Sequence, residues 1–289
     1  MARNREKKGS LVHQVKAVFD GKLAIGRSKF EDKKAGLSDD KIYSWSTYKS
    51  YLKHSVYFVE WAKKTYNIKS LDESKKYVNE WLEKRDTEDN LSSYTVKLET
   101  SSLIKLFGLS KDEVYTSKNR VRSDISRSRG EKKRDKFFSE ENHSELVEFC
   151  RSVGLRRGEL QQIKGSDLIY INDKPFINVT RNTKGGRSRL IPIIINTDFV
   201  VQKFKNAGDN KLFDTIPNGA DIHGYRADFA TSLYKKLARD VSELPKSDKY
   251  FCRKDLKGVC WDKQAMLKVS QALGHNRISV IAGHYIRRD

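Results

Sequence analysis

The sequence predicts a mainly α-helical protein with a small antiparallel β-sheet, divided into an all-helical first domain and a mixed α+β second domain. Between residues 41 and 108 apolar side chains recur at helical spacing. Between residues 167 and 195 three short runs rich in β-branched residues are separated by turn residues. The expected organisation is a basic N-terminal extension (1–40), a helical domain (41–110), a basic linker (111–136) and a second domain (137–289).

The charge of the chain is strongly unbalanced. Its 289 residues include 58 Lys and Arg against 38 Asp and Glu, a formal net charge of +20. Such an excess attracts polyanions, of which nucleic acid is the commonest for a soluble chain, and a solvated basic surface without a specific partner is the alternative. No apolar run approaches the roughly 20 residues that cross a bilayer, and no apolar stretch of signal-peptide length follows the basic N-terminus. We expect a cytoplasmic, nucleoid-associated protein without membrane contact.

The three cysteines favour a reducing compartment. Cys150, Cys252 and Cys260 are an odd number without metal-binding spacing. Cys252 and Cys260 could form a disulfide, or they could be two buried thiols. Neither a metal nor a cofactor is expected, because the sequence has no paired Cys/His clusters, no Walker loop, no zinc-protease helix and no dinucleotide fingerprint.

The first domain is predicted as three helices. Residues 44–64 carry one buried stripe at helical spacing, formed by Tyr48, Leu52, Ser55, Val59 and Ala62. Residues 71–85 form the second helix, whose inward side chains are Leu71, Val78 and Leu82. The third helix, over 90–108, ends at Gly108. In the N-terminal extension, "LVHQVKAVF" predicts one short helix with frayed ends.

The linker and the second domain follow. The serine-rich, basic stretch 111–136 could track a phosphate backbone or be a solvated connector. A helix begins after a possible N-cap at Ser139, and further helices are expected at 223–239 and 262–273. The strands "DLIYI", "FINVT" and "RLIPIII" are joined by "NDKP" and "RNTKGGRS". Residues 239–264 predict an added loop or hairpin with "KDLKG" as its turn, which could touch DNA, touch a neighbouring subunit or be inert.

Two short stretches of the second domain carry candidate functional residues. In "GLRRGEL", Arg156 and Glu159 are three positions apart, so on a helix the carboxylate could orient the guanidinium. An ordinary surface ion pair is the alternative. In "RNTKGGRSR", Lys184 lies at the tip between two strands, where two glycines allow a tight turn and close approach to another molecule. The alternative there is an exposed hairpin.

Two further stretches add histidines and a tyrosine. In "HGYR", His223 and Arg226 share a face at the start of an amphipathic helix, where an anion is favoured. The stretch "QAMLKVSQALGH" predicts a helix ending at Gly274 with His275 at its exit, and a short helix or turn carries Tyr285.

Together these residues suit phosphoryl transfer without a metal. Arginines neutralise the non-bridging oxygens of a crowded phosphorus centre, a tyrosine hydroxyl attacks phosphorus to form a covalent intermediate, and histidine and lysine move protons. A covalent intermediate conserves the bond energy, so a strand could be rejoined without ATP.

The motifs "GLRRGEL", "TKGG", "HGYR" and "LGHNR" and the final tyrosine occur in the order of the tyrosine recombinases, the phage-integrase-type enzymes, and the second domain resembles their catalytic domain. The helical first domain resembles their core-binding domain, which closes around DNA with the catalytic domain. Two departures stand out: His275 and Tyr285 are ten positions apart, where nine is usual in the family, and the segment between Arg226 and His275 is long.

The resemblance implies a role for each candidate. Arg156 and Arg226 would grip the scissile phosphate, and Lys184 would protonate the leaving 5′ oxygen. His223 and His275 would assist proton transfer and hydrogen-bond the phosphate. Tyr285 would attack to give a 3′-phosphotyrosine, and Glu159 would support the site without reacting.

The implied function is site-specific recombination of duplex DNA recombination sites by a homotetramer, as an integrase of a mobile element or a simpler recombinase. Accessory DNA-bending or directionality proteins could be further partners. A type IB topoisomerase, a telomere resolvase and a non-catalytic DNA-binding relative are the alternatives. A nucleophile on a terminal segment could also be positioned only when the tetramer assembles.

Overall fold

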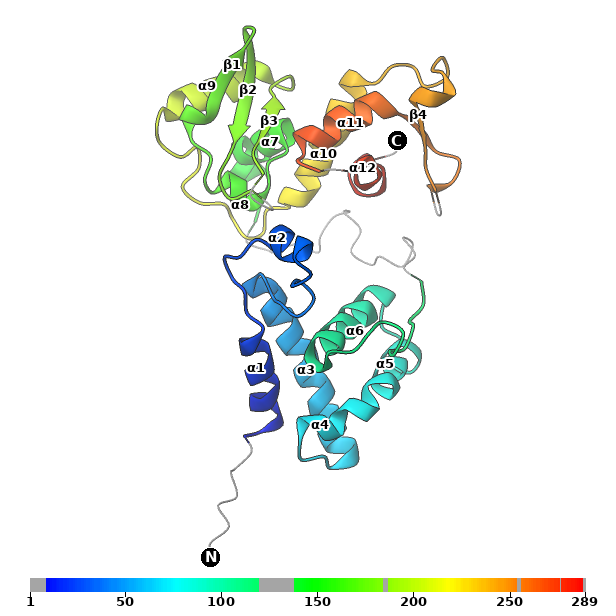
Figure 1. Ribbon diagram of the computed structural model, residues 1–289. Helices are drawn as coiled ribbons and strands as arrows, with labels where there is room; N and C mark the ends of the chain where they lie inside the picture. The colour runs from blue at the N-terminus through cyan, green and yellow to red at the C-terminus, as the bar shows by residue number, and fades with distance from the viewer. Residues whose placement is uncertain (1–8, 120–137, 184–186, 254–255, 276, 288–289) are drawn as a thin grey trace, which may run out of the picture. The chain divides into compact units, whose positions relative to one another are not determined.

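The computed structural model describes residues 9–119, 138–183, 187–253, 256–275 and 277–287 (Figure 1). The chain divides into two compact units, residues 1–126 and residues 127–289, each with its own hydrophobic core. None of the helices in the described ranges is long and apolar enough to cross a bilayer. The predicted mainly α fold, with a helical first part and a small sheet confined to the second, is confirmed.

The first unit is entirely helical. Its elements are α1 (Leu11–Gly21), α2 (Lys29–Lys34), α3 (Trp45–Tyr66), α4 (Leu71–Ser74), the 3₁₀ turn η1 (Lys75–Tyr77), α5 (Val78–Thr87) and α6 (Ser93–Phe107). Five of these helices begin after a serine whose hydroxyl accepts a backbone N–H from the first turn, namely Ser10, Ser28, Ser44, Ser70 and Ser92. Such caps satisfy N–H groups that a helix start leaves unpaired.

Helix α1 is part of the first core. Val15 and Phe19 are fully buried in the cluster that also contains Phe58 and Val59 of α3. Residues predicted as a basic extension therefore contribute a packed helix, because the apolar face of α1 requires a partner. The short helix α2 has no counterpart among the predicted elements.

The predicted helices of the first unit are confirmed, with one break. Tyr48, Ser55, Val59 and Ala62 of the α3 stripe are buried and Leu52 is half-buried. The predicted helix 71–85 is divided into α4, η1 and α5, with Leu71, Val78 and Leu82 inward as predicted. Gly108 ends α6 in a left-handed conformation, φ 64°.

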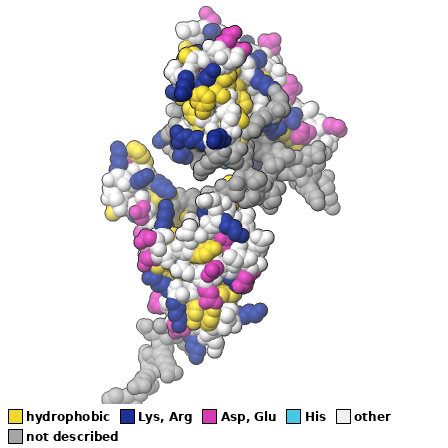
Figure 2. All heavy atoms as spheres, turned by 90° about the vertical axis from the view of Figure 1, so that its right-hand side faces the viewer, with side chains coloured by type: hydrophobic (Ala, Val, Ile, Leu, Met, Phe, Trp, Pro, Cys, Tyr) yellow, Lys and Arg dark blue, Asp and Glu magenta, His cyan; other side chains and the backbone are white. Residues whose placement is uncertain are grey.

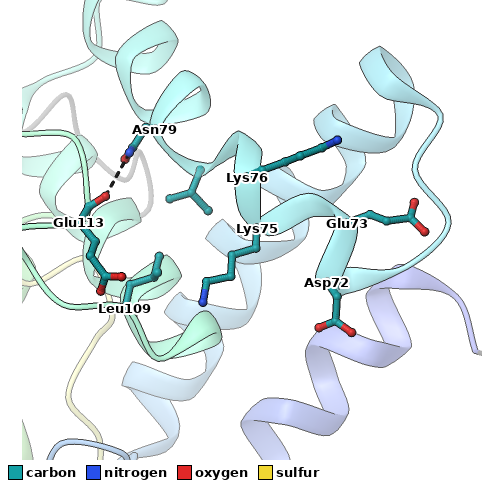
Figure 3. Close-up of a pocket in the computed structure, with 8 residues that line it drawn as sticks. Asp72, Glu73, Lys75, Lys76, Asn79, Leu109 and Glu113 are labelled. Atoms are coloured by element: carbon teal, nitrogen blue, oxygen red, sulfur yellow. Dashed lines mark hydrogen bonds between the residues drawn. The ribbon is translucent and has the colours of Figure 1, made fainter.

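The start of the predicted linker packs on the first unit. Val114 belongs to its core, and Asn79 of α5 donates to the Glu113 carbonyl (3.1 Å, Figure 3) and accepts from the Tyr115 amide (2.8 Å). The Tyr115 hydroxyl donates to the buried carboxylate of Asp86 (3.1 Å). Residues 113–115 are thus held by packing and polar contacts, whereas residues 120–136 of the predicted linker lie outside the described residues.

The second unit combines helices with two small sheets. Its helical elements are η3 (Glu141–His143), α7 (Ser144–Val153), α8 (Arg157–Leu160), η4 (Gly165–Asp167), α9 (Thr197–Ala207), α10 (Ile222–Leu237), η5 (Lys246–Asp248), α11 (Lys263–Ala272) and α12 (Ile278–His284). Its strands are β1 (Leu168–Ile171), β2 (Lys174–Val179), β3 (Arg189–Pro192), β4 (Lys249–Phe251) and β5 (Cys260–Asp262). Helix α9 was not predicted from the sequence.

Three antiparallel strands form the sheet in the order β1–β2–β3, as predicted. Asn172 and Asp173 both have positive φ (48° and 60°) in the β1–β2 turn, which matches the twist of a two-residue hairpin. Ile177 and Ile191 are register partners and are buried in the second core. The connection between β2 and β3 contains Lys184, which lies outside the described residues.

The long segment before α11 was predicted as a loop or a hairpin, and it forms a hairpin. Strands β4 and β5 pair antiparallel, with Phe251 opposite Cys260. Cys252 directly follows Phe251, so alternation along the strand directs it to the other face from Cys260. Both cysteines are free thiols.

Gly154 is essential for packing in the second unit. It ends α7 with φ 60°, and a Cβ at this position would lie 2.2 Å from Cδ1 of Phe229 in α10. Its carbonyl also accepts a hydrogen bond from Arg226. The left-handed backbone and the close approach of α10 both require glycine here.

Gly154→Ala should therefore lower the free energy of unfolding by about 3 kcal/mol, combining backbone strain with overpacking. Gly108→Ala is the matched control: it caps a helix with φ 64° and ψ 34°, but no atom lies within 4 Å of its Cβ position. The control should lose only about 1 kcal/mol. Urea titration of both variants provides the comparison, and equal losses would contradict a packing role for Gly154.

Candidate active site

Arg156 and Glu159 form the predicted ion pair, but by a different geometry from the predicted shared helix face. Arg156 precedes α8 with an extended backbone (φ −79°, ψ 157°). The Glu159 carboxylate accepts both the Arg156 backbone N–H (2.7 Å) and Arg156 Nη1 (2.8 Å). The pairing is therefore a capping interaction, in which the side chain of the third helical residue returns to the residue before the helix.

A second arginine binds the same carboxylate. Arg189, at the start of β3, donates to both Glu159 oxygens at 2.7 Å. Burial raises the pKa of Glu159, but the hydrogen bonds and charge of Arg189, reinforced by Arg156, outweigh that effect and lower it to about 2. Arg189 was not predicted as a site residue, because nothing local distinguishes it from neighbouring arginines in its basic segment.

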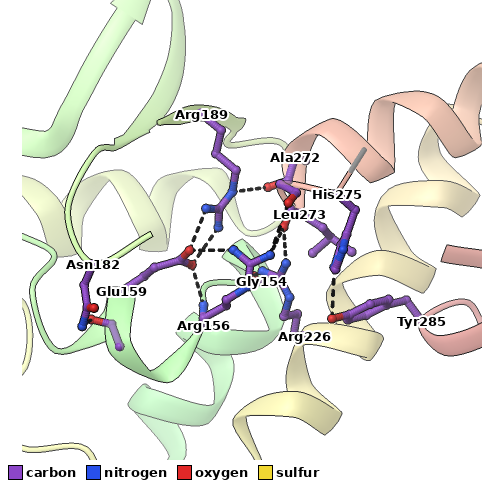
Figure 4. A network of polar contacts seen from close by, with 12 residues as sticks. Gly154, Arg156, Glu159, Asn182, Arg189, Arg226, Ala272, Leu273, His275 and Tyr285 are labelled. Atoms are coloured by element: carbon purple, nitrogen blue, oxygen red, sulfur yellow. Dashed lines mark hydrogen bonds and ion pairs between the residues drawn. The ribbon is translucent and has the colours of Figure 1, made fainter. Parts of the chain in front are cut away.

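The C-terminal end of α11 binds three arginines through backbone carbonyls (Figure 4). Arg189 Nε donates to Ala272 O (2.8 Å), and Arg156 Nη2 donates to Leu273 O (2.9 Å). Arg226 Nη2 also donates to Leu273 O. The last carbonyls of a helix lack intrahelical partners and form its negative end, so they suit guanidinium groups.

Arg226 is almost completely buried, at 2% exposure. Besides Leu273 O it contacts Gly154 O through Nη1, whereas its Nε has no hydrogen-bond partner in the structure as described. Burial, followed by repulsion from the Arg156 charge, lowers the pKa of Arg226 to about 10. The residue therefore remains a cation at neutral pH, with one buried N–H group unsatisfied.

Tyr285 lies against this cluster. Its Oη is 3.2 Å from Nε2 of His275, and its ring centroid is 5.5 Å from Cζ of Arg226 (Figure 4). The His223 ring lies 5.3 Å from the Tyr285 ring, centroid to centroid. These contacts occur within one chain, and the hypothesis that tetramer assembly positions Tyr285 stays a prediction.

The structure thus brings together five of the six predicted catalytic residues, which come from segments far apart in the sequence. They are Arg156, His223, Arg226, His275 and Tyr285, with Glu159 beneath them. The sixth, Lys184, lies outside the described residues. Helix α10 carries both His223 and Arg226, and its N-cap Asp221 accepts the Gly224 amide (3.2 Å).

Arg157 has a different task from the neighbouring Arg156. Its guanidinium donates to four backbone carbonyls, those of Ile216, Pro217, Asn218 and Ala220, at 2.8 to 3.3 Å. This loop leads into α10, so Arg157 fixes the approach to the helix that carries His223. The two adjacent arginines of "GLRRGEL" are thereby distinguished, which spacing alone could not do.

The charge of the cluster favours an anion. The cluster contains three guanidinium groups and one carboxylate. Glu159 binds Arg156 and Arg189, Arg226 donates to backbone carbonyls, and the helix end contributes only about half a negative charge. Figure 2 shows many further Lys and Arg side chains among Asp and Glu on the visible face. Within the described ranges, no group of three or more His, Cys, Asp or Glu side chains could hold a metal.

An open cavity of about 490 Å³ on the first unit is a weaker candidate (Figure 3). Its lining mixes acidic side chains with lysines: Asp72, Glu73, Lys75, Lys76, Val78, Asn79, Leu109 and Glu113. Opposite charges on one open surface select neither anions nor cations, so no site is assigned there.

Neither a protein-family model nor a curated protein matches the chain. Among solved structures it is similar to XerH site-specific recombinase bound to palindromic difH substrate, with 17% identity, covering 96% of this chain and 92% of that chain, at a TM-score of 0.49. It is also similar to the Tn1549 transposon integrase in complex with circular intermediate DNA (17% identity, 97% of each chain, TM-score 0.44) and to XerA recombinase (15%, 96% of this chain and 95% of that chain, 0.31). At these values the likeness carries no functional argument, and the function must be inferred from the site itself.

The low pKa of Glu159 predicts an acid-dependent loss of stability. Because the folded pKa (about 2) lies below the ordinary value, the stabilisation is complete above about pH 5 and is lost as the pH falls towards 2, a change of about 3 kcal/mol. In Glu159→Gln this contribution is absent. The difference in unfolding free energy between wild type and variant should therefore shrink on acidification, measured by urea titration between about pH 5 and pH 2.5.

Glu243→Gln, at an exposed position, is the control. Its free energy of unfolding should change with pH as that of wild type does over this range. If the free energy of unfolding of Glu159→Gln also changed with pH as that of wild type does, the carboxylate would not be ionised and paired as described.

The contacts of Arg157 predict that Arg157→Lys lowers the free energy of unfolding by about 2 kcal/mol, since an ammonium cannot reach four carbonyls in a planar fork. Arg151→Lys is a suitable control, because Arg151 is half-exposed in surface ion pairs. It should change stability by less than about 1 kcal/mol. Equal effects of the two substitutions in urea titration would contradict the assigned role.

Proposed function

We propose that this protein is a site-specific DNA recombinase of the tyrosine recombinase type, which cleaves and rejoins duplex DNA through a 3′-phosphotyrosine intermediate. The observation that carries the proposal is the phenol of Tyr285 lying between His275 and Arg226, beside a cluster with more guanidinium groups than carboxylates. The order of motifs along the chain and the basic net charge of +20 support the same conclusion.

Arg156 and Arg226 are proposed to bind the scissile phosphate. The Nε of Arg226 has no hydrogen-bond partner among the described residues, so a phosphate oxygen could accept from it once the groups that bury it move aside. The Leu273 carbonyl already orients both guanidinium groups, and Glu159 also orients that of Arg156, so their geometry is largely set before a phosphate arrives. Arg189 is not proposed to bind the phosphate, because three of its N–H groups already donate to Glu159 and Ala272 and its side chain is only 7% exposed.

The cleavage step transfers a phosphoryl group from a sugar oxygen to Tyr285. The phenolic oxygen forms a bond to phosphorus while the bond from phosphorus to the 5′ oxygen breaks. His275, in the tautomer with Nε2 unprotonated, accepts the phenolic proton. The proposed donor of a proton to the leaving 5′ oxygen is Lys184, and His223 would hydrogen-bond the phosphate.

Rejoining reverses these steps with a 5′ hydroxyl from another strand as the attacking group. No bond energy is lost to water, so neither ATP nor a metal is required in this scheme. Exchange between two recombination sites requires four half-site-bound copies, so the proposed assembly is a homotetramer on DNA. A type IB topoisomerase or telomere resolvase would form the same adduct but yield relaxed plasmid or hairpin ends instead of recombined sites.

A covalent trap tests the nucleophile. The protein is incubated with a pool of nicked duplexes of randomised sequence. After cleavage the short fragment with the 5′ hydroxyl diffuses away, so the strand cannot be rejoined and the covalent adduct accumulates. We expect a protein–DNA adduct that survives denaturing electrophoresis, and sequencing of its DNA identifies the site. Tyr285→Phe should abolish the adduct, and Arg226→Ala should slow its formation by at least about 100-fold.

Tyr250→Phe is the matched control, because this tyrosine of β4 lies in the hairpin, opposite Trp261 of β5. It should form the adduct as wild type does. Persistence of the adduct in Tyr285→Phe would refute the assignment of the nucleophile, and absence of any adduct with wild type would refute the recombinase proposal.

A further inference from the structure

The segment that follows α12 is bound to helix α10 of the same chain. Tyr285 has non-helical backbone angles (φ −125°, ψ −46°), and the amides of Tyr285 and Ile286 both donate to the Ile281 carbonyl (3.0 and 3.1 Å). Ile286 is buried in the second core. Terminal residues are ordered only where such contacts hold them.

A threonine of α10 binds the backbone beside Tyr285. Thr231 Oγ1 accepts the backbone N–H of Arg287 at 3.0 Å and lies 3.4 Å from the Tyr285 carbonyl oxygen. The same hydroxyl donates to Ala227 O (2.9 Å), a helical bond that fixes its rotamer. Thr231 therefore holds the chain directly after the reactive side chain.

An arginine of the segment adds an ion pair to the same helix. Arg287 Nη1 lies 2.9 Å from Asp228 Oδ1, and Arg287 Nη2 donates to Gly224 O (3.3 Å). The other oxygen of Asp228 accepts from Arg151 of α7 (3.3 Å). Asp228 is thus held from a second helix, and Arg287 reaches along α10 past the turn that contains Arg226.

We propose that Asp228, Thr231 and Arg287 form a latch that positions Tyr285 for attack on a phosphate bound by the same chain. The latch holds the backbone on the C-terminal side of the nucleophile and attaches it to the helix that carries His223 and Arg226. Arg287 is a positioning residue in this scheme, because it acts through Tyr285 and touches no reacting atom. This inference rests on the proposed function, since it takes Tyr285 as the nucleophile.

The latch is suited to positioning more than to stability. The side chain of Arg287 is 46% exposed and that of Asp228 is 24% exposed, and exposed ion pairs contribute little to global stability. A small displacement of a nucleophile, in contrast, slows a reaction strongly. Loss of the latch should therefore affect the chemical step while leaving folding and DNA affinity nearly unchanged.

Two measurements on the full-length protein test the latch. Hydrogen–deuterium exchange of the amides of residues 284–287 needs no DNA, and Arg287→Ala should raise their exchange rates about 10-fold. With the duplex recovered from the covalent trap at saturating concentration, the same variant should form the adduct about 10-fold more slowly. DNA affinity should stay within about 2-fold of wild type, because no phosphate-binding residue has changed.

Three further variants sharpen the test. Arg287→Lys keeps the charge opposite Asp228 and should recover most of the rate, whereas Thr231→Val removes the hydroxyl and should slow adduct formation like Arg287→Ala. Arg277→Ala removes an exposed arginine at the other end of α12 and should leave exchange at 284–287 unchanged.

Each result has a distinct meaning. Unchanged exchange in Arg287→Ala, or faster exchange without any loss of adduct rate, would overturn the latch. If reduced DNA affinity accounted for the whole loss of adduct-formation rate, Arg287 would be a DNA contact, and the latch would also be overturned. If wild type forms no adduct, the proposed function fails, and the exchange data alone decide whether the latch holds this segment.

Discussion

The C-terminal end of α11 is the constraint on which the second unit's site depends. Its last carbonyls accept hydrogen bonds from Arg156, Arg189 and Arg226, which arrive from three separate segments of the chain. Like charges at such short range repel one another, more strongly when they are removed from water. The partial negative charge of the helix end and the buried Glu159 offset this repulsion, so the three arginines can be held together here.

The N-terminal end of α11 is also held by side-chain hydrogen bonds. Asp262 caps the helix by accepting the amides of Gln264 and Ala265, and Arg239 binds both of its oxygens at 2.9 Å. The hydrogen bonds of Arg239 hold the pKa of Asp262 well below its ordinary range despite burial. Because Asp262 is also the last residue of β5, the hairpin that precedes α11 sets the position of the helix. A structural role thus accounts for a segment whose function the sequence left open.

The sequence predicted features that depend on local spacing. The buried stripe of α3, the turn at Asn172 and Asp173 and the β4–β5 hairpin all follow from periodicity and turn chemistry. The candidate residues were found because several motifs occur in one order, and the structure brings the described ones to one place.

Features that depend on tertiary partners could not be predicted. Arg189 is one of several arginines in a basic segment, and only the fold places it on Glu159. The separate tasks of Arg156 and Arg157 likewise depend on distant carbonyls. Helix α1 belongs to the first core because α3 offers it an apolar face. The many lysines and arginines near the N-terminus gave no indication of this packing.

The balance of charge explains why a cluster of three arginines contains a single carboxylate. A second buried carboxylate would leave the cluster only about half a positive charge and weaken its attraction for a phosphate, whereas none would leave three largely buried cations without an anionic partner. Glu159 binds Arg156 and Arg189, whereas Arg226 donates to the Gly154 and Leu273 carbonyls and lies against the Tyr285 ring. The least neutralised guanidinium therefore lies next to the phenol, which is where a phosphate must bind if Tyr285 is to attack it.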